Sequence, residues 1–195
     1  RFVAAGDLAR QPYLVMEHVE GRSLKEWTDR APVPPGEVAV IGSAVATALH
    51  RLHLQEAIHL DVKPSNIIIR PGGEAVLIDF GLAHHAHYPD LLAEEIRSPI
   101  GSAPYIAPEQ VMGVRWEPRS DVFALGTILY EVLTGRNPFR FGTAREALKA
   151  VQELDPPSAS AVNPRAGRAL SAICRKAMAT IPAAIPEVTV SSAMV

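Results

Sequence analysis

The sequence has little of several features that mark particular classes of protein. It has one cysteine in 195 residues, Cys174, which excludes an internal disulfide framework and fits a reducing compartment. The formal net charge of −2 leaves no basic excess, which argues against nucleic acid as a partner. The longest apolar stretch, residues 122–133, is too short to cross a membrane, so it predicts a buried helix.

The chain does have enough apolar residues to build a core. Hydrophobic residues make up 48% of the sequence. Its length of 195 residues suits one domain or most of one. The chain starts at Arg1 without an initiating methionine or a capping signal, so we expect it to be a piece of a larger protein. Residues 181–195 show no helical stripe, and we expect them to form an atypical tail.

Apolar periodicity predicts some β-structure at the front of the chain and mostly helix behind it. Residues 12–19 read as a strand, and the two apolar runs around the turn at residues 70–75 read as a hairpin. A short helix is expected after Ser23, its N-cap. Longer helices are predicted over residues 37–54, 119–134, 143–154 and 167–179, and a loop over residues 82–104. The predicted fold class is α+β.

Four polar residues flank the predicted hairpin. Asp61, Lys63 and Asn66 precede its first strand, and Asp79 ends its second, so all four can face one cleft. Carboxylate and carboxamide oxygens suit Mg²⁺, which usually completes its shell with substrate phosphate. A lysine can neutralise phosphate charge, and a carboxylate can orient an attacking hydroxyl. Asp61 alone would be a turn or capping aspartate, whereas the four together predict a phosphoryl-transfer site.

Longer motifs follow one another in a fixed order. They are HLDVKPSN at residues 59–66, DFG at 79–81, GSAPYIAPEQ at 101–110 and SDVFALGTILYEVLTGRNPF at 120–139. In this order and spacing the sequence resembles the eukaryotic-type (Hanks-type) protein kinases, and the third motif resembles the bacterial serine/threonine branch. The resemblance covers residues 13–178. It implies a protein-kinase-like fold made mainly of the helical C-lobe, with the hinge and the end of the N-lobe sheet.

Carried over by position, the resemblance implies ATP and Mg²⁺ as cofactors and protein substrates as partners. Asp61 would be the catalytic carboxylate that accepts or orients the substrate hydroxyl proton, and Lys63 would contact the transferred phosphate. Asn66 and Asp79 would hold Mg²⁺. Lys63, together with Ser102 where the family has a threonine, implies serine/threonine rather than tyrosine substrates.

The resemblance also assigns residues to the nucleotide pocket and to its supports. The expected ATP contacts are the gatekeeper Met16, the hinge residues Glu17 and Val19, the ribose contact Ser23, and Leu24 and Ile68 on either side of adenine. Among the expected supports, Asp121 would bind backbone amides of the catalytic loop, and His59 would stack with Phe80. The other two are Gly81 of the metal-binding motif and Glu109 at the end of the activation segment.

The sequence departs from the family in the catalytic loop. The family usually has an arginine at the position of Leu60, where it pairs with a phosphate on the activation loop. We therefore expect activity not to depend on phosphorylation of that loop. Replacement of Ser98, the best-placed serine of the loop, by alanine in the full-length kinase would test this expectation.

The two ends of the chain also depart from the family. The acidic residue and the arginine of the family's closing pattern are replaced by Ile181 and Ile185, so Glu109 would lack its usual partner. Either the tail is altered or another basic residue substitutes. No G-x-G-x-x-G motif is found, so the glycine-rich loop and its lysine are expected to precede Arg1.

These observations predict three segments and leave two readings open. Residues 1–19 would be a remnant of the N-lobe sheet with the hinge, residues 20–180 the kinase C-lobe, and residues 181–195 the tail. The first reading is a partial serine/threonine kinase catalytic domain that is weakly active or inactive on its own. The alternative is an inactive kinase remnant that acts as a binding scaffold. A small-molecule phosphotransferase is disfavoured, because Ser102 and the APE segment build a peptide-docking surface.

The remaining expectations concern location and the histidines of the long loop. A cytoplasmic domain is predicted, or the cytosolic part of a larger membrane-anchored kinase, with no membrane span in this chain. The sequence leaves dimerisation open. His84, His85 and His87 suggest either a metal site or a solvated loop. No cysteine or carboxylate stands at matching spacing, which favours the solvated loop.

Overall fold

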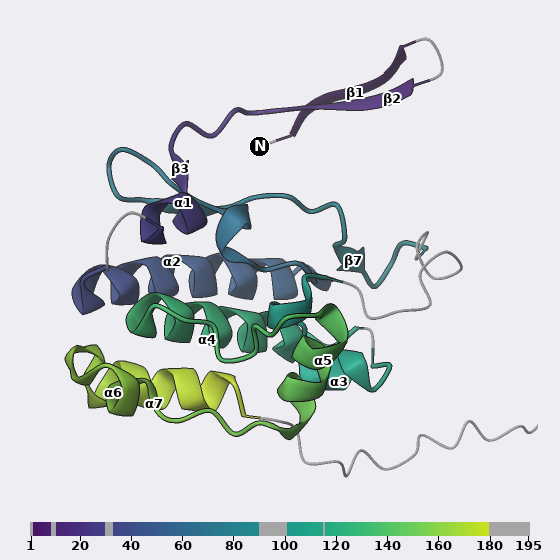
Figure 1. The fold of residues 1–195 in the computed structure, drawn as a ribbon. Coiled ribbons are helices and arrows are strands. Elements are labelled where there is room, and N and C mark those ends of the chain that lie inside the picture. Colours follow the sequence, from purple (N-terminus) through teal and green to yellow (C-terminus); the bar gives the residue numbers. More distant parts are fainter. Residues whose placement is uncertain (1, 9–10, 30–32, 90–100, 115, 180–195) are drawn as a thin grey trace, which may run out of the picture.

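The computed structural model describes residues 2–8, 11–29, 33–89, 101–114 and 116–179. A two-stranded hairpin, β1 (Phe2–Leu8) and β2 (Gln11–Met16), extends from one end of a larger helical part (Figure 1). The strands pair antiparallel, with Ala5 opposite Leu14. Apolar side chains such as Leu8 (73% exposed) and Met16 (63% exposed) face solvent. Few contacts within the described chain therefore cover this hairpin.

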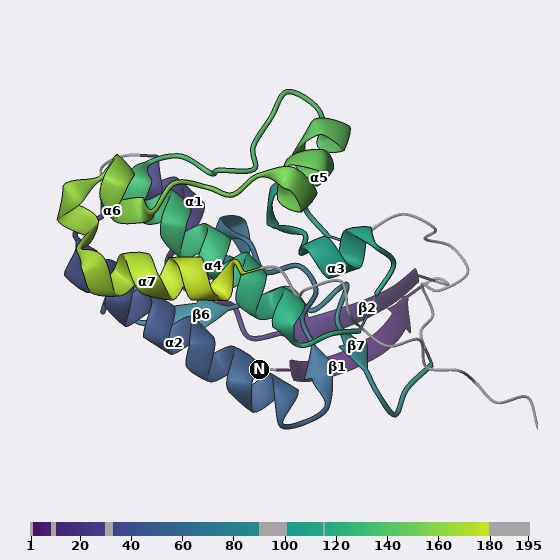
Figure 2. The same cartoon turned by 90° about the horizontal axis from the view of Figure 1, so that it is seen from below.

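Three helices stack to form the core of the helical part (Figure 2). They are α2 (Pro35–His53), α4 (Arg119–Thr134) and α7 (Arg168–Ala177). The central helix α4 is buried on almost all sides, as its apolar sequence predicts. It ends at Gly135, whose φ of 76° is the left-handed conformation that glycine adopts without strain. A Cβ on Gly126 would lie 2.6 Å from the Ala177 Cβ, so a glycine is needed where α4 crosses α7.

Further helices complete the helical part. They are α1 (Leu24–Thr28), α3 (Pro108–Val111), α5 (Ala144–Glu153) and α6 (Ala159–Val162), with 3₁₀ turns η1 (Pro64–Asn66), η2 (Ala103–Tyr105) and η3 (Pro164–Ala166). Ser23 caps α1 as predicted, since its hydroxyl accepts a hydrogen bond from the Glu26 amide at 3.2 Å. The four longer helices lie where the periodicity places them.

Two small sheets flank the segment that carries Asp61. Strands β3 (Arg22–Ser23), β5 (Ile67–Ile69) and β6 (Ala75–Leu77) form an antiparallel sheet in that order, which confirms the predicted hairpin. Strands β4 (Ala57–Ile58) and β7 (His84–His85) form a second, two-stranded sheet. The prediction of an unbroken loop over residues 82–104 is therefore wrong at β7 and η2, because elements of two or three residues leave no periodic pattern.

The α+β fold class is confirmed by this mixture of helices and small sheets. Within the part of the chain that the structure describes, no helix is both long and apolar enough to span a bilayer.

Candidate active site

The loop after β4 is fixed by the side chain of a distant aspartate. Asp121, 1% exposed at the start of α4, accepts hydrogen bonds from the backbone amides of His59 and Leu60, each at 2.9 Å. Leu60 has a φ of 64°, a left-handed conformation that costs a leucine roughly 1–2 kcal/mol. Hydrogen bonds to a buried carboxylate offset that cost. Asp121 thus sets the direction in which the chain enters Asp61.

His53 strengthens this anchor and was missed by the sequence analysis. It lies in the last turn of α2, and its Nε2 is 2.8 Å from the Asp121 Oδ2. The two residues are 68 positions apart, and no local pattern sets His53 apart from the other polar residues in its turn. One carboxylate therefore joins the end of α2, the loop after β4 and the start of α4.

Asp61 is the centre of a group of polar side chains. It is 7% exposed, and its Oδ2 accepts a hydrogen bond from the Lys63 Nζ at 2.5 Å. The Asn66 Nδ2 donates to the Asp61 backbone oxygen at 3.0 Å and to its Oδ2 at 3.3 Å. The Ser102 hydroxyl donates to the Asp61 Oδ1 at 3.1 Å. These contacts compensate the burial of the carboxylate and fix its orientation.

The segment that carries Ser102 lies directly on the loop after β4. Gly101 has a φ of 118°, and a Cβ there would stand 2.8 Å from the Leu60 backbone oxygen. Only glycine permits this approach without strain. Further along, the Tyr105 hydroxyl donates to the Glu131 Oε2 at 2.7 Å. Burial, then the Glu131 carboxylate, raises the pKa of Tyr105 well above its usual value.

Asp79 follows β6 and lies across the hairpin from Asn66. The two strands stay in register up to this point, because the Ile78 amide donates to the Asn66 backbone oxygen at 2.9 Å. Asp79 has a φ of 66° and is exposed, and its Oδ1 accepts a hydrogen bond from the Gly81 amide at 3.2 Å. Its other carboxylate oxygen makes no hydrogen bond within the described chain.

These residues fit a magnesium ion in their donor chemistry. The Asn66 Nδ2 is engaged with Asp61, so its Oδ1 is the end available to a metal. Together with the Asp79 carboxylate, it offers hard oxygen ligands of the kind that hold Mg²⁺ beside substrate phosphate. The described residues contain no group of three or more histidine, cysteine, aspartate or glutamate side chains that would hold a metal alone.

His59 connects the two candidate segments. It is fully buried, its Nε2 donates to the Ile78 backbone oxygen at 3.1 Å, and its Nδ1 accepts a hydrogen bond from the Asp61 amide at 3.3 Å. A carbonyl only accepts, so the proton is assigned to Nε2. The ring of Phe80 lies 4.9 Å away, centroid to centroid. His59 is therefore placed as a packing and linking residue between both sides of the site.

The expected adenine contacts do not all lie at a surface. Leu24 is 1% exposed and belongs to the same buried cluster as Ile67, so its contact with adenine stays a prediction. It packs in the core beneath the sheet, whereas Ile68 is half-buried and remains accessible. The Ser23 hydroxyl already accepts the Glu26 amide, but it keeps a proton to donate.

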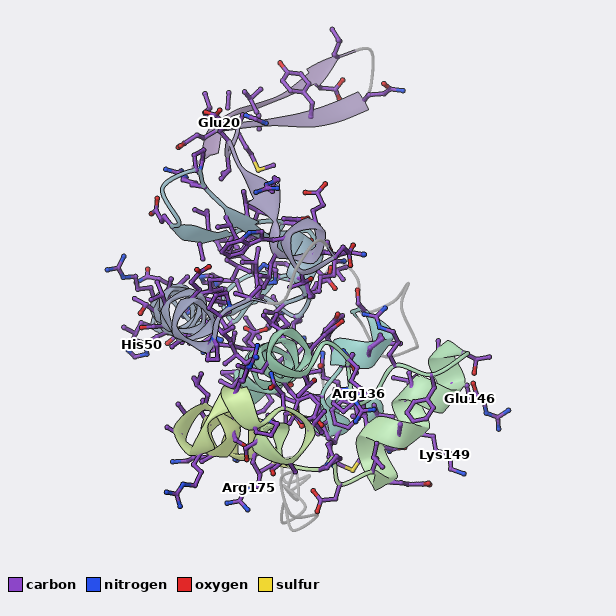
Figure 3. The ribbon with its side chains drawn as sticks, turned by 60° about the vertical axis from the view of Figure 1, so that its left-hand side comes forward. Glu20, His50, Arg136, Glu146, Lys149 and Arg175 are labelled. Atoms are coloured by element: carbon purple, nitrogen blue, oxygen red, sulfur yellow. The ribbon has the colours of Figure 1, made fainter. Side chains whose placement is uncertain are left out.

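The hinge segment joins the hairpin to the helical part, and Glu20 lies at this junction (Figure 3). Met16 and Glu17 are exposed and Val19 is half-buried. The Arg70 Nη2 lies 3.5 Å from the Glu17 Oε1 and connects the hinge to the β5–β6 turn. Arg70 was not anticipated, because its partner is 53 residues away.

Residues 2–181 match the profile of the protein kinase domain. The chain belongs to the protein kinase family. This membership confirms the resemblance that the ordered motifs indicate.

Bacterial serine/threonine kinases are among the relatives of this kinase chain. It is 38% identical over 158 residues to the serine/threonine-protein kinase PknL of Mycobacterium tuberculosis, which covers 80% of the chain and 39% of the relative. It is also 38% identical to PrkC of Bacillus subtilis (87% of the chain, 26% of the relative) and to Pkn1 of Myxococcus xanthus (88% and 25%). The chain thus spans about a quarter to two-fifths of the length of these relatives.

Glu109 shows how this kinase chain departs from its family. Its carboxylate is 3% exposed and accepts a hydrogen bond from the Ser120 hydroxyl at 2.9 Å. No basic side chain forms an ion pair with it within the described ranges. Beside it lies a cavity of about 450 Å³ whose lining includes Arg119 and Lys176. Ile181, Ile185 and Ser98 lie outside the described residues.

Proposed function

We propose that the protein containing this chain transfers the γ-phosphate of ATP to serine or threonine hydroxyls of proteins. The observation that carries the proposal is the convergence of Lys63, Asn66 and Ser102 on the buried carboxylate of Asp61. Family membership supports it, as do the names of the relatives. Residues 1–19 would supply the remaining N-lobe strands and hinge, and residues 20–180 the C-lobe.

The reaction follows from what each side chain can do. The substrate hydroxyl approaches Asp61, which accepts its proton as the oxygen attacks the γ-phosphorus. The bond between the γ-phosphorus and the bridging oxygen breaks, and ADP leaves with that oxygen. Lys63, adjacent to Asp61, neutralises charge on the transferred group. Bound Mg²⁺ would supply charge neutralisation on the phosphates, and the Asn66 Oδ1 and the Asp79 carboxylate would hold it.

Positioning accounts for much of this catalysis, and the structure supports a preassembled acceptor side. Asp61 is held by contacts from its own loop and from the segment after Gly101. Serine and threonine as acceptors are what the family resemblance at Lys63 and Ser102 implies, and both side chains contact the Asp61 carboxylate. Ile68, the hinge backbone at Glu17 and Val19, and the Ser23 hydroxyl would receive the nucleoside.

The test is phosphorylation of a generic protein substrate by the full-length gene product with radiolabelled ATP. Asp61→Asn removes the proton acceptor and keeps the shape of the side chain, so the rate should fall by about 10²–10⁴-fold. The matched control is Asp29→Asn, which alters an exposed aspartate paired with Lys25 and should change the rate by less than about twofold. Equal rates for the two variants would refute the proposal.

A scaffold that binds kinase partners or substrates without catalysis is the second candidate function. It is favoured by the exposed hairpin, where apolar side chains such as Leu8 and Met16 face solvent. The 195-residue chain alone is expected to show little kinase activity. Robust phosphorylation by that chain, abolished by Asp61→Asn, would contradict this expectation.

A further inference from the structure

The histidine-rich segment after Asp79 forms part of a sheet behind the candidate site. His84 pairs with Ile58, His85 pairs with Ala57, and the Ala86 amide donates to the Glu56 backbone oxygen at 3.0 Å. Ile58 stands three residues before Asp61, and His84 stands five residues after Asp79. The β4–β7 ladder therefore connects the two segments that carry the candidate catalytic and metal-binding aspartates.

This ladder is too short to hold β7 by itself. It pairs two residues with two, and an isolated two-stranded pair is marginal in water at best. The segment between Asp79 and β7 adds one backbone hydrogen bond, from the Ala83 amide to the Phe80 oxygen at 3.1 Å. Asp79 is exposed, and its backbone has a left-handed conformation. The orientation of its side chain therefore depends on where the following strand, β7, is held.

A ring from another part of the chain packs on β7. The imidazole of His84 stacks on the indole of Trp116, with ring centroids 4.8 Å apart and an interplanar angle of 20°. Trp116 lies between α3 and α4, and it is 50% exposed, so it is not a core residue. Stacked rings at this distance contribute beyond the area that they bury.

We propose that Trp116 is a positioning residue for Asp79. By stacking on His84 it holds β7 against β4, and this fixes the direction in which the chain leaves the metal-binding motif. The inference rests on the proposed function only in that Asp79 is taken as a magnesium ligand. The stack would connect the segment before α4 to the strand that follows Asp79.

The experiment measures backbone hydrogen exchange and kinase activity in the full-length gene product. Trp116→Ala should raise exchange at the amides of residues 84–86 by about threefold to tenfold, the range expected for one aromatic pair. The same variant should need a threefold to tenfold higher Mg²⁺ concentration to reach its half-maximal rate. Trp116→Phe keeps a stacking ring and should stay within about twofold of the parent in both measurements. The control is Phe141→Ala, which removes an equally exposed ring (50%) that lies outside β7.

The two measurements separate this inference from the proposed function. Unchanged exchange in Trp116→Ala would overturn the stack as a support of β7. Faster exchange with an unchanged Mg²⁺ dependence would overturn the positioning role. If the protein shows no kinase activity, calorimetry with an ATP analogue measures its affinity for Mg²⁺ instead. Equal affinities in the parent and in Trp116→Ala would then overturn the positioning role. His84→Ala should match Trp116→Ala, and the double variant should add nothing further.

Discussion

Asp61 and Asp79 flank the same hairpin, and their surroundings differ in almost every respect. Asp61 is 7% exposed and accepts hydrogen bonds from Lys63, Asn66 and Ser102. Asp79 is exposed, left-handed and bonded through its side chain to the Gly81 amide. The difference teaches that the proposed acceptor side, at Asp61, is assembled by contacts within the helical part. On the proposed metal side, Asp79 has one side-chain hydrogen bond, whereas Asn66 is buried and bonded to Asp61.

The largest expected effect comes from breaking the anchor of the acceptor side. Asp121→Ala leaves the amides of His59 and Leu60 buried without their acceptor and removes the partner of His53. We expect the free energy of unfolding to fall by about 3–5 kcal/mol, as for a broken buried polar network. Urea denaturation measures it.

The control for this variant is Asp155→Ala, which removes an exposed carboxylate and should cost less than about 0.5 kcal/mol. A loss below about 1 kcal/mol in Asp121→Ala would show that the loop after β4 is held by other contacts, and the contrast with Asp79 would weaken.

A second, smaller effect concerns the buried hydroxyl on the acceptor side. Below the unfolded pKa of about 10, Tyr105 is protonated in both states, and above it the unfolded chain loses the proton first because burial raises the folded pKa. The free energy of unfolding should therefore fall as pH rises above about 10, by up to about 1.4 kcal/mol per pH unit for this proton. Denaturation at several pH values measures the slope.

Tyr105→Phe should make that slope shallower between about pH 10 and 12, while Tyr13→Phe removes an exposed hydroxyl and controls for the loss of a phenol. An unchanged slope in Tyr105→Phe would mean that the hydroxyl ionises as easily in the folded chain as in the unfolded one.

The smallest effect on stability is expected at the metal side. Asp79→Asn changes an exposed side chain with one hydrogen bond, so the free energy of unfolding should change by less than about 0.5 kcal/mol. The rate of phosphorylation at limiting Mg²⁺ should nevertheless fall at least tenfold, because a carboxylate ligand is lost.

Glu20→Gln, at an exposed position beside the hinge, is the matched control for this charge change. If Asp79→Asn destabilised the chain as strongly as Asp121→Ala, the two sides of the site would not differ in the way described above.

The acceptor side was predictable from sequence for a simple physical reason. Asp61, Lys63 and Asn66 lie within six residues, and the turn η1 keeps them close to one another in space. The bounds of α4 were likewise predictable, because its apolar run is long and ends at a glycine. Short-range spacing carries this kind of information.

The features that the sequence did not reveal are those set by distant contacts. A left-handed Leu60 contradicts the local preference of leucine and is stabilised by Asp121 across 61 residues. Leu24 is the first residue of α1 and the one buried residue of that helix, and nothing in its local sequence predicted this burial. Strand β7 is two residues long, and its partner lies far back in the chain.

The carboxylate of Asp121 also has a consequence for how this domain tolerates change over generations. It belongs to a helix whose neighbours are core residues, and it directly binds the loop that carries Asp61. A substitution that displaces the start of α4 would therefore displace the backbone that leads into Asp61, even where the core stays packed. Natural selection on activity alone would then purge core variants that remain well folded, and sequence drift in α4 would be slower than burial by itself demands.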